Sequence, residues 1–375
     1  MKWEKVRLGD VTDSCLGKML DKEKNRGEYQ LYLSNKDVRW GSFDLEHLDL
    51  MKFEEHEEER YGVRYGDLIV CEGGEPGRCA IWKDQIPNMK IQKALHRVRV
   101  HEGLDYRFLY YWFLWAGKRG ELQQYFTGAT IKHMPGDKIK SVIITKPDIE
   151  TQRQIADVLS AYDDLIENNQ KQIKLLEEAA QRLYKEWFVD LQFPGHENTE
   201  IVDGLPKGWS NAKVTDLLEI KYGKDHKALE EGDIPVYGSG GIMRKVQPVL
   251  YSGESVLIPR KGSLNNILFV EGDFWTIDTM FYSIPRLENV AKYAYLYLRG
   301  LDMYSFNIGA AVPSMTTKIL SGMDIVLPSK QILQQFEEQL SPVFARMKCL
   351  EMQCETATEA RDRLLPKLMS GEIEL

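Results

Sequence analysis

The sequence lacks the signature motifs of several enzyme classes. It has no G-x-x-x-x-G-K-[ST] phosphate-binding loop, which excludes a P-loop ATPase. It has no Asn/Asp-Pro-Pro-aromatic tetrapeptide, which excludes the active site of a DNA amino-methyltransferase. Its 7 histidines form no H-x-x-x-H pair or other metal-ligand spacing. We therefore expect a binding protein with no catalytic residue and no metal.

Long apolar runs and paired cysteines are also missing. The longest apolar run, Phe108 to Ala116, has nine residues, against the roughly 20 that a membrane-spanning helix needs. The first residues, Met1-Lys-Trp-Glu, carry charge where a signal peptide would be apolar. The 5 cysteines are scattered with no C-x-x-C, which suits free thiols in a reducing compartment. These features predict a soluble, cytoplasmic protein with no membrane partner.

The charge is distributed unevenly along the chain. The 375 residues include 49 basic and 57 acidic side chains, for a net charge of −8. Residues 151–200 hold 10 acidic against 5 basic side chains, residues 331–375 hold 8 against 5, and the rest is balanced. A balanced domain can still carry a basic face, so the net charge does not exclude DNA as a partner.

The sequence contains an internal duplication, in which corresponding residues are 181 positions apart. Each copy has short β-type runs, a short aromatic helix and then a long helix. The matches include Met134 with Met315, Pro147 with Pro328, Gln154 with Gln335, and Leu183 with Leu364. We expect an α+β fold of two mixed α/β domains, each followed by a long helix. The expected segments are domain 1 (1–150), helix 1 (151–190), a linker (191–207), domain 2 (208–330) and helix 2 (331–375).

Both long helices carry a heptad seam in the same register. Their shared a/d positions include Leu159, Ile166, Asn169, Ile173, Leu176 and Leu183 in the first helix, and Leu340, Met347, Leu350, Cys354, Arg361 and Leu364 in the second. We expect an antiparallel coiled coil about 50 Å long, with pseudo-twofold symmetry between the copies. The polar seam residues Asn169 and Arg361 would fix its register. The alternative is that each helix packs only on its own domain.

Polar and basic side chains cluster in the predicted turns, where they could reach phosphates and base edges of DNA. Any one of them could instead be an ordinary solvated side chain. Trp187 and Phe188, near the joint of the copies, are candidate anchors for protein partners, although Trp187 also continues the heptad seam and could be structural. The candidate DNA contacts are Ser34, Asn35, Lys36, Arg39, Arg78, Lys90, Gln92, Lys93, Lys132 and His133 in the first copy, and Tyr237, Ser239, Arg260, Lys261, Ser263, Asn265, Trp275 and Thr276 in the second.

Two other functions stay open. Asp203, Glu219 and Lys221 could form a two-carboxylate metal site, which would make the chain a self-contained metal-dependent restriction nuclease. Such acid-x-Lys triplets also arise by chance in a chain with 28% charged residues. The other alternative is a protein scaffold that does not read DNA.

Several longer sequence stretches together are specific for one protein family, although each alone would not be. They are residues 66–82 (GDLIVCEGGEPGRCAIW), 91–97 (IQKALHR), 147–159 (PDIETQRQIADVL), 183–195 (LYKEWFVDLQFPG), 235–241 (PVYGSGG), 256–263 (VLIPRKGS), 274–279 (FWTIDT) and 364–373 (LLPKLMSGEI). Through these stretches the chain resembles, over its full length, the specificity subunits of Type I restriction–modification systems.

The resemblance implies a non-catalytic subunit that takes part in defence against foreign DNA. Its two target-recognition domains would each read one half of a split double-stranded DNA target, and the coiled coil would fix the spacer between the halves. It also implies two methylation subunits docked on this chain, with restriction/translocase subunits able to join. S-adenosylmethionine, ATP and Mg²⁺ are then expected on the partner subunits, with no cofactor on this chain.

Overall fold

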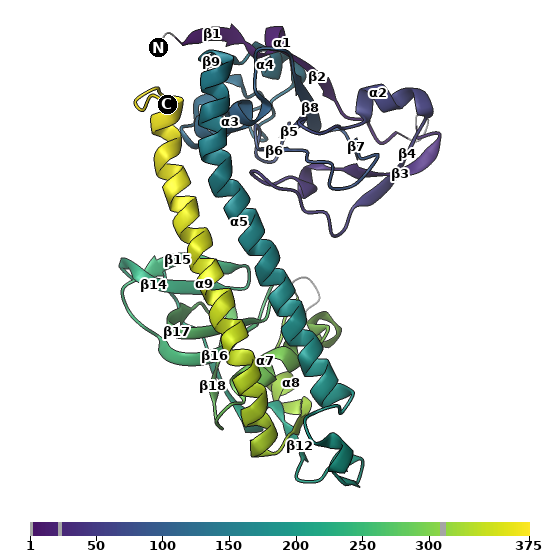
Figure 1. The fold of residues 1–375 in the computed structure, drawn as a ribbon, viewed down its shortest axis with the longest axis vertical. Coiled ribbons are helices and arrows are strands. Elements are labelled where there is room, and N and C mark those ends of the chain that lie inside the picture. The colour runs from purple at the N-terminus through teal and green to yellow at the C-terminus, as the bar shows by residue number, and fades with distance from the viewer. Residues whose placement is uncertain (1–2, 22–24, 308–312) are drawn as a thin grey trace. The chain divides into compact units, whose positions relative to one another are not determined.

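The computed structural model describes residues 3–21, 25–307 and 313–375. Within it the chain forms two compact units. Unit 1 comprises Met1–Asn168 and Gln353–Leu375, and unit 2 comprises Asn169–Met352. Each unit therefore contains one globular part and a stretch of both long helices (Figure 1).

Unit 1 is built on a four-stranded sheet of order β2-β8-β5-β6, a three-stranded sheet of order β4-β3-β7, and the antiparallel pair β1-β9. Strand β5 is buried on both faces, which explains its unbroken apolar run. The strands are β1 (Glu4–Arg7), β2 (Thr12–Leu16), β3 (Glu28–Leu33), β4 (Asp49–Phe53), β5 (Leu68–Cys71), β6 (Cys79–Ile81), β7 (Lys90–Ile91), β8 (Leu95–Val100) and β9 (Ile143–Lys146). The helices are α1 (Leu8–Val11), α2 (Glu58–Tyr61), α3 (Tyr106–Lys118), α4 (Gly136–Ser141) and the first part of α5 (Ile149–Tyr184).

Helix α3 supplies eight buried residues to the core on one face of the four-stranded sheet. The Asp105 carboxylate caps it by accepting hydrogen bonds from the N–H groups of Arg107 and Phe108, at 2.8 and 3.2 Å. The aromatic run that follows is buried against apolar side chains of β5, β6 and β8. The other face of the same sheet packs against residues of β3 and β7.

Unit 2 contains a six-stranded sheet of order β13-β18-β16-β17-β14-β15 and the antiparallel pair β12-β19. Helix α7 packs against this sheet. The strands are β10 (Ile201–Val202), β11 (Leu205–Pro206), β12 (Ser210–Lys213), β13 (Leu218–Tyr222), β14 (Glu231–Gly238), β15 (Gly241–Val246), β16 (Tyr251–Pro259), β17 (Leu268–Thr276), β18 (Met280–Pro285) and β19 (Asp324–Leu327). The helices are α6 (Val214–Leu217), α7 (Ala291–Arg299), α8 (Thr317–Gly322) and α9 (Lys330–Met369), whose last turns belong to unit 1.

The order of elements confirms the duplication and the α+β class predicted from the sequence. β1-α1-β2 in unit 1 corresponds to β12-α6-β13 in unit 2, and the antiparallel pairs β1-β9 and β12-β19 occupy the same place in each copy. A short aromatic helix (α3 or α7), a one-turn helix (α4 or α8) and a long helix (α5 or α9) then follow in both copies.

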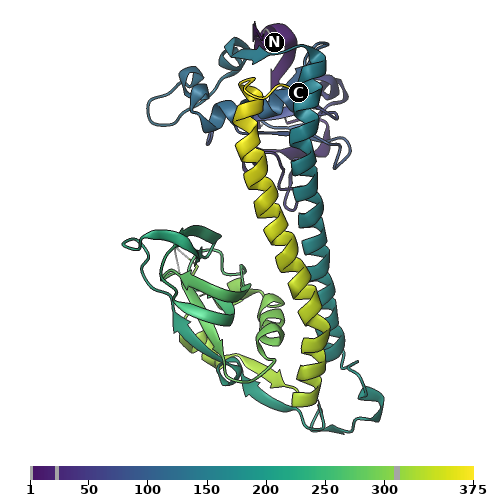
Figure 2. The same cartoon turned by 60° about the vertical axis from the view of Figure 1, so that its left-hand side comes forward.

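The two long helices contact each other in each unit (Figures 1 and 2). In unit 1, Ile155 and Leu159 of α5 share a core cluster with Leu365 and Leu368 of α9. In unit 2, the end of α5 packs on the start of α9, where the rings of Trp187 and Phe336 lie 5.4 Å apart. Early residues of one helix thus meet late residues of the other, so the predicted antiparallel pairing is confirmed. The predicted seam positions are all buried or half-buried.

The seam of unit 1 includes a network of charged and polar groups. Arg361 of α9 donates from Nη1 to Asp163 Oδ1 of α5 at 2.5 Å, and Asp163 also accepts the Tyr111 hydroxyl hydrogen at 2.6 Å. Arg361 contacts Asp362, which in turn pairs with Lys118. Burial lowers the pKa of Arg361, but the charges and hydrogen bonds of Asp163 and Asp362 together outweigh burial, so the net shift is upward. The network therefore ties both helices to α3 within unit 1.

The end of α5 differs from the prediction. The residues Lys185–Val189 form a π-helical turn after Tyr184. This turn directs both Trp187 and Phe188 inward, where they are buried with Phe336 and Tyr293. The prediction that Trp187 and Phe188 anchor protein partners is therefore wrong, because both rings belong to the core of unit 2.

Among the described residues, no helix is both long and apolar enough to cross a membrane.

We predict that Asp163→Ala lowers the free energy of unfolding by about 2 kcal/mol or more, because it leaves the half-buried Arg361 and the Tyr111 hydroxyl without this acceptor. Chemical denaturation of the full chain measures the change. The matched control is Asp164→Ala, since Asp164 is 68% exposed and lies 3.6 Å from Lys83. The control is expected to change stability by less than about 0.5 kcal/mol. Equal effects of the two substitutions would contradict the role given to Asp163.

Candidate nucleic-acid interface

Four loops of unit 1 are joined by backbone hydrogen bonds. Gln92 N–H donates to Leu33 O at 3.0 Å, which links the loop after β7 to the loop after β3. Glu72 N–H donates to Ala94 O at 2.8 Å, and Met134 N–H donates to Glu72 O at 2.7 Å. The loops that begin at residues 34, 72, 92 and 127 therefore lie together, and they hold most of the first-copy candidates. We call them the unit 1 loop cluster.

The first loop is shaped by its own polar side chains. The Asp37 carboxylate accepts hydrogen bonds from both the N–H and the hydroxyl of Ser34, at 2.7 Å each, and so closes a short turn. Arg78 donates from Nη2 to Asn35 O at 3.0 Å. A Cβ on Gly74 would lie 2.7 Å from Asn35 Nδ2, so the second loop approaches the first closely at this glycine. Ser34 and Arg78 thus hold the loops in place.

Four of the predicted cationic side chains of the cluster are exposed: Lys36, Arg39, Lys93 and Lys132. Lys36 pairs with Asp49 at 2.7 Å, with both side chains more than half exposed. The hydrogen bond that Lys36 donates to the Asp49 carboxylate raises the pKa of Lys36. His133 is exposed as well, and Gln92 is half-buried. An exposed pair of this kind is weak enough to exchange its carboxylate for a DNA phosphate.

Lys90 is an exception. Its side chain is fully buried and its ammonium group donates to Asn88 O at 2.6 Å and pairs with Glu58 at 2.8 Å. The prediction that Lys90 contacts DNA is wrong, because this lysine holds the acidic segment around α2 against β7.

Unit 2 brings together the loop after β16, the turn after β14 and the turn before β18. Arg260 N–H donates to Thr279 O at 2.8 Å, and Ile277 N–H donates to Tyr237 O at 3.0 Å. Asn266 donates from Nδ2 to Ser239 O at 2.9 Å. We call these three segments the unit 2 loop cluster.

Arg260 and Lys261 are the cationic groups of this cluster. The Arg260 guanidinium donates to Asp278 O at 3.1 Å and lies 5.4 Å from the ring centre of Tyr222. Lys261 and Ser263 are exposed, and Ser239 is half-buried. The cluster thus presents an oriented guanidinium, an exposed ammonium group and the hydroxyl groups of Ser239 and Ser263.

Three other second-copy candidates have structural roles. Trp275 is 9% exposed and packs with Val236, while Thr276 is fully buried. Their prediction as DNA contacts is therefore wrong. Asn265 is exposed, but its Oδ1 accepts from Met303 N–H at 2.8 Å and its Nδ2 donates to Asp302. Tyr237 is half-buried beside Phe274.

A polar cavity that no sequence motif indicates lies beside the unit 1 loop cluster. It has a volume of about 460 Å³, and Glu72, His96 and Lys140 line it. His96 is 2% exposed, and its Nε2 lies 3.5 Å from Glu72 Oε2 without hydrogen-bond geometry. Neither atom has a hydrogen-bond partner among the described residues. Burial, and secondarily the Lys140 charge, lower the pKa of His96 below its ordinary value, although Glu72 opposes the shift.

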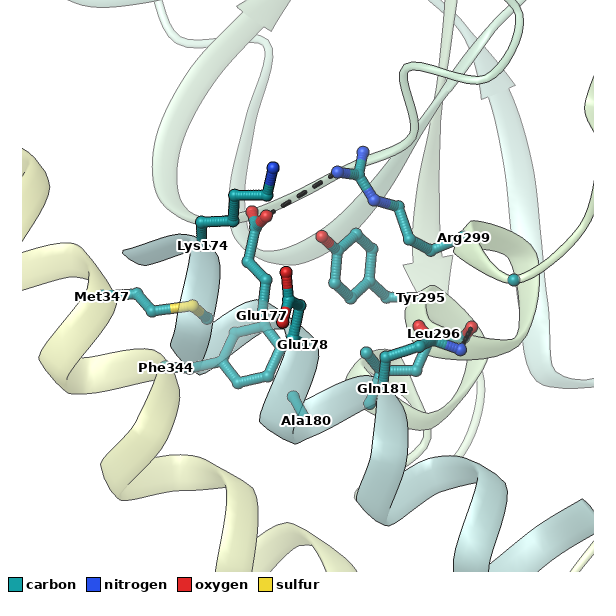
Figure 3. Close-up of a pocket in the computed structure, with 11 residues that line it drawn as sticks. Lys174, Glu177, Glu178, Ala180, Gln181, Tyr295, Leu296, Arg299, Phe344 and Met347 are labelled. Carbon is teal, nitrogen blue, oxygen red and sulfur yellow. Dashed lines mark hydrogen bonds and ion pairs between the residues drawn. The ribbon is translucent and has the colours of Figure 1, made fainter. Parts of the chain in front are cut away.

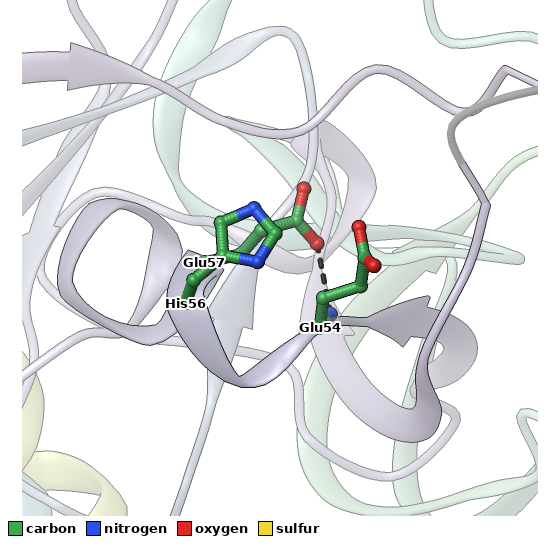
Figure 4. Close-up of side chains that lie close together, drawn as sticks. All are labelled: Glu54, His56 and Glu57. Atoms are coloured by element: carbon green, nitrogen blue, oxygen red, sulfur yellow. Dashed lines mark hydrogen bonds between the residues drawn. The ribbon is translucent and has the colours of Figure 1, made fainter.

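Three side chains of the types that bind metal ions lie close together in unit 1. Among the described residues, ligand atoms of Glu54, His56 and Glu57 lie within 4.8 Å of one another (Figure 4). Glu57, however, already pairs with the buried Lys18 at 2.5 Å and accepts from Glu54 N–H. Of the predicted nuclease triplet, Glu219 pairs with Lys221 at 2.6 Å, and Asp203 lies on a different element, in the turn between β10 and β11.

A pocket of about 310 Å³ lies in unit 2 between α5, α7 and α9 (Figure 3). Tyr295, Phe344 and Met347 provide apolar surface. Arg299 lies 3.8 Å from Glu177 at its rim. The pocket can accept an apolar side chain, and its rim can pair with charges of either sign.

Comparison with known proteins agrees with this architecture. Residues 1–178 and 206–353 match the Type I restriction modification DNA specificity domain. The chain is 27% identical over 341 residues to the MjaIX specificity subunit of a Type I restriction enzyme from Methanocaldococcus jannaschii, covering 83% of this chain and 78% of the relative. It is 24% identical over 412 residues to the MjaVIII specificity subunit of the same organism, covering 100% and 93%.

The fold is also similar to that of a solved structure. The crystal structure of a Type I restriction–modification S subunit from M. genitalium aligns with a TM-score of 0.60 at 20% sequence identity. The alignment covers 98% of this chain and 96% of that chain.

We predict that lowering the pH below about 6.5 destabilises unit 1 through His96. The folded state keeps this imidazole neutral, so the stabilisation is complete above the unfolded pKa near 6.5 and is lost as the pH falls toward the lower folded pKa. In this window the free energy of unfolding should fall by up to about 1.4 kcal/mol per pH unit from this group. In chemical denaturation at pH 7 and pH 5.5, the free energy of unfolding of His96→Gln should change less between the two pH values than that of wild type. A control, His101→Gln, changes an exposed histidine and should leave the slope unchanged.

Proposed function

The chain belongs to the Type I restriction modification DNA specificity family, and from this premise we propose that it reads a split DNA target. The unit 1 loop cluster reads one half and the unit 2 loop cluster reads the other. The observation that carries the proposal is that each copy brings cationic side chains together with hydroxyl or amide groups in one set of adjacent loops.

Each cluster supplies two kinds of contact. Lys36 and Lys132 in unit 1, and Arg260 and Lys261 in unit 2, are placed to bind phosphates, which gives affinity without sequence information. Amide, imidazole and hydroxyl groups such as those of Asn35, His133 and Ser263 can hydrogen-bond base edges in the major groove. Because the two clusters differ in residue type, the two half-sites need not be related by symmetry.

The paired helices set the distance between the half-sites in this proposal. Helices α5 and α9 span 36 and 40 residues and each contributes to both units. A continuous helix is stiff along its axis and rises about 1.5 Å per residue. The number of residues in the pair therefore determines the unspecified spacer of the target.

Catalysis belongs to partner subunits in this proposal. Two methylation subunits dock on the acidic, exposed faces of the long helices, and restriction/translocase subunits join the assembly. The pocket lined by Tyr295, Phe344 and Met347 offers an apolar socket for a partner side chain on these helices. S-adenosylmethionine, ATP and Mg²⁺ bind to those partners, which fits the absence of the corresponding motifs from this sequence.

Phosphate contacts are tested by salt dependence. In the complex with its methylation subunits, Lys36→Ala with Lys132→Ala, and separately Arg260→Ala with Lys261→Ala, should lower the slope of log affinity against log salt by about 1 per lost contact. The control pair, Lys185→Ala with Lys207→Ala, removes the same charge from side chains 63% and 71% exposed outside both clusters. It should leave the slope within error of wild type. A slope unaffected by the cluster variants would exclude these contacts.

The spacer role is tested by shortening a helix. Removing four residues, about one turn, from positions 163–178 should change the spacer that the complex accepts, read by mapping methylated adenines in the host genome. Removing residues 196–199, a short turn in the linker after α5, is the control and should leave the spacer unchanged. An unaltered spacer after the helix deletion would refute the proposal.

A further inference from the structure

The loop of residues 127–133 in the unit 1 loop cluster is held in one conformation by its own backbone. Thr127 and His133 exchange both backbone hydrogen bonds, at 2.8 and 2.9 Å. Lys132 Nζ donates across the loop to Gly128 O at 2.9 Å. Gly128 has a φ of +91°, and a Cβ there would lie 2.2 Å from Ile131 O, so this tight turn requires glycine. The loop therefore presents its tip in a fixed geometry.

An aliphatic side chain lies at that tip. Ile131 is 65% exposed, and its neighbours Thr130 and Lys132 are exposed as well. A single exposed isoleucine is common on protein surfaces and needs no explanation by itself. Its position within a polar cluster, on a loop with little freedom to fold it away, is the informative feature.

The loop is packed directly against the other polar loops. A Cβ on Gly73 would lie 3.1 Å from the His133 ring, and Met134 N–H donates to Glu72 O at 2.7 Å. The polar side chains of this cluster can recognise hydrogen-bonding groups on bases. The feature that marks thymine in the major groove is its C5 methyl group, which is recognised through an apolar contact. Within this loop, Ile131 is the large aliphatic side chain that can make it.

We propose that Ile131 determines specificity by packing on the C5 methyl group of a thymine in the half of the target read by unit 1. This inference rests on the proposed function, since it requires that the unit 1 loop cluster faces DNA. It adds a named base feature to the contacts and predicts a thymine at one defined position of one half-site.

The experiment combines protein and DNA changes in a double-mutant cycle. The target of the complex with its methylation subunits is first mapped from methylated adenines. Each thymine of both half-sites is then replaced singly by uracil, which lacks only the methyl group. Binding of each duplex is measured with wild-type complex, with Ile131→Ala, and with the control Ile143→Ala. Ile143 lies on β9 and is 41% exposed.

At one thymine, uracil should weaken wild-type binding about fourfold, the effect of losing one buried methyl group. Ile131→Ala should weaken binding to the native duplex by a similar or larger factor and should be indifferent to uracil at that position. Ile143→Ala should behave as wild type, and Ile131→Val should retain part of the uracil effect. Thermal unfolding should be the same for all variants.

Two results would overturn the inference while leaving the proposed function intact. One is sequence-specific wild-type binding that Ile131→Ala does not weaken. The other is a loss on Ile131→Ala that adds to every uracil effect without coupling at any thymine. A wild-type complex with no preference for any sequence would instead overturn the proposed function, and this inference with it.

Discussion

In each unit the globular core is completed by turns of two helices that come from distant parts of the chain. The core of unit 1 includes Leu159 of α5 and Leu368 of α9, and the core of unit 2 includes Ala180 and Leu340. Neither copy can therefore bury its apolar surface with its own sequence alone: unit 1 needs the last turns of α9, and unit 2 needs the last turns of α5. The antiparallel helix contact is in this way a condition for the folding of both units.

Several charged side chains of the globular parts form ion pairs within their own unit. Lys18 and Lys90 are buried and pair with Glu57 and Glu58 in the acidic segment at α2. Arg99 makes a two-pronged ion pair with Asp67 at 2.7 Å. These cations hold one strand or helix against another and are not free to meet phosphates. The lysines that remain exposed at the loop clusters, such as Lys36, Lys132 and Lys261, can contact DNA, and partner subunits can add further contacts.

The helix seam could be predicted from the sequence because its signal is periodic and repeated. Residues seven apart lie on one face whatever their neighbours are, and the register of α5 recurs in α9. Individual loop residues were harder to predict, since exposure depends on tertiary contacts. Lys90 is a charged residue on a short strand whose partner lies in α2, and Trp275 faces a small apolar cluster of the β14-β15 ribbon. Nothing in the local sequence distinguishes these two from exposed neighbours.

His96 and Ile131 illustrate two further reasons why sites escape sequence reasoning. His96 follows an alternating strand pattern that makes it an ordinary inward residue, and its polar cavity exists only because Glu72 and Lys140 arrive from other elements. In the sequence, Ile131 cannot be distinguished from a buried apolar residue. Only the structure shows that the closed turn of residues 127–133 leaves its side chain exposed to solvent.

Different physical constraints act on the sequence of the duplicated framework and on the sequence of the divergent loops. The pairs β1-β9 and β12-β19, and the long helices, bury apolar surface, so a change in one copy must be matched by its packing partners. The loops have few such packing partners, so their sequences can change more freely. Unit 1 has the β4-β3-β7 sheet where unit 2 has the β14-β15 ribbon, and the same framework holds both. A chain built in this way can alter the surface that reads one half-site without disturbing the helices. In a recognition protein, this arrangement keeps the helices and strand pairs needed for assembly constant, while the loops vary and define the DNA target.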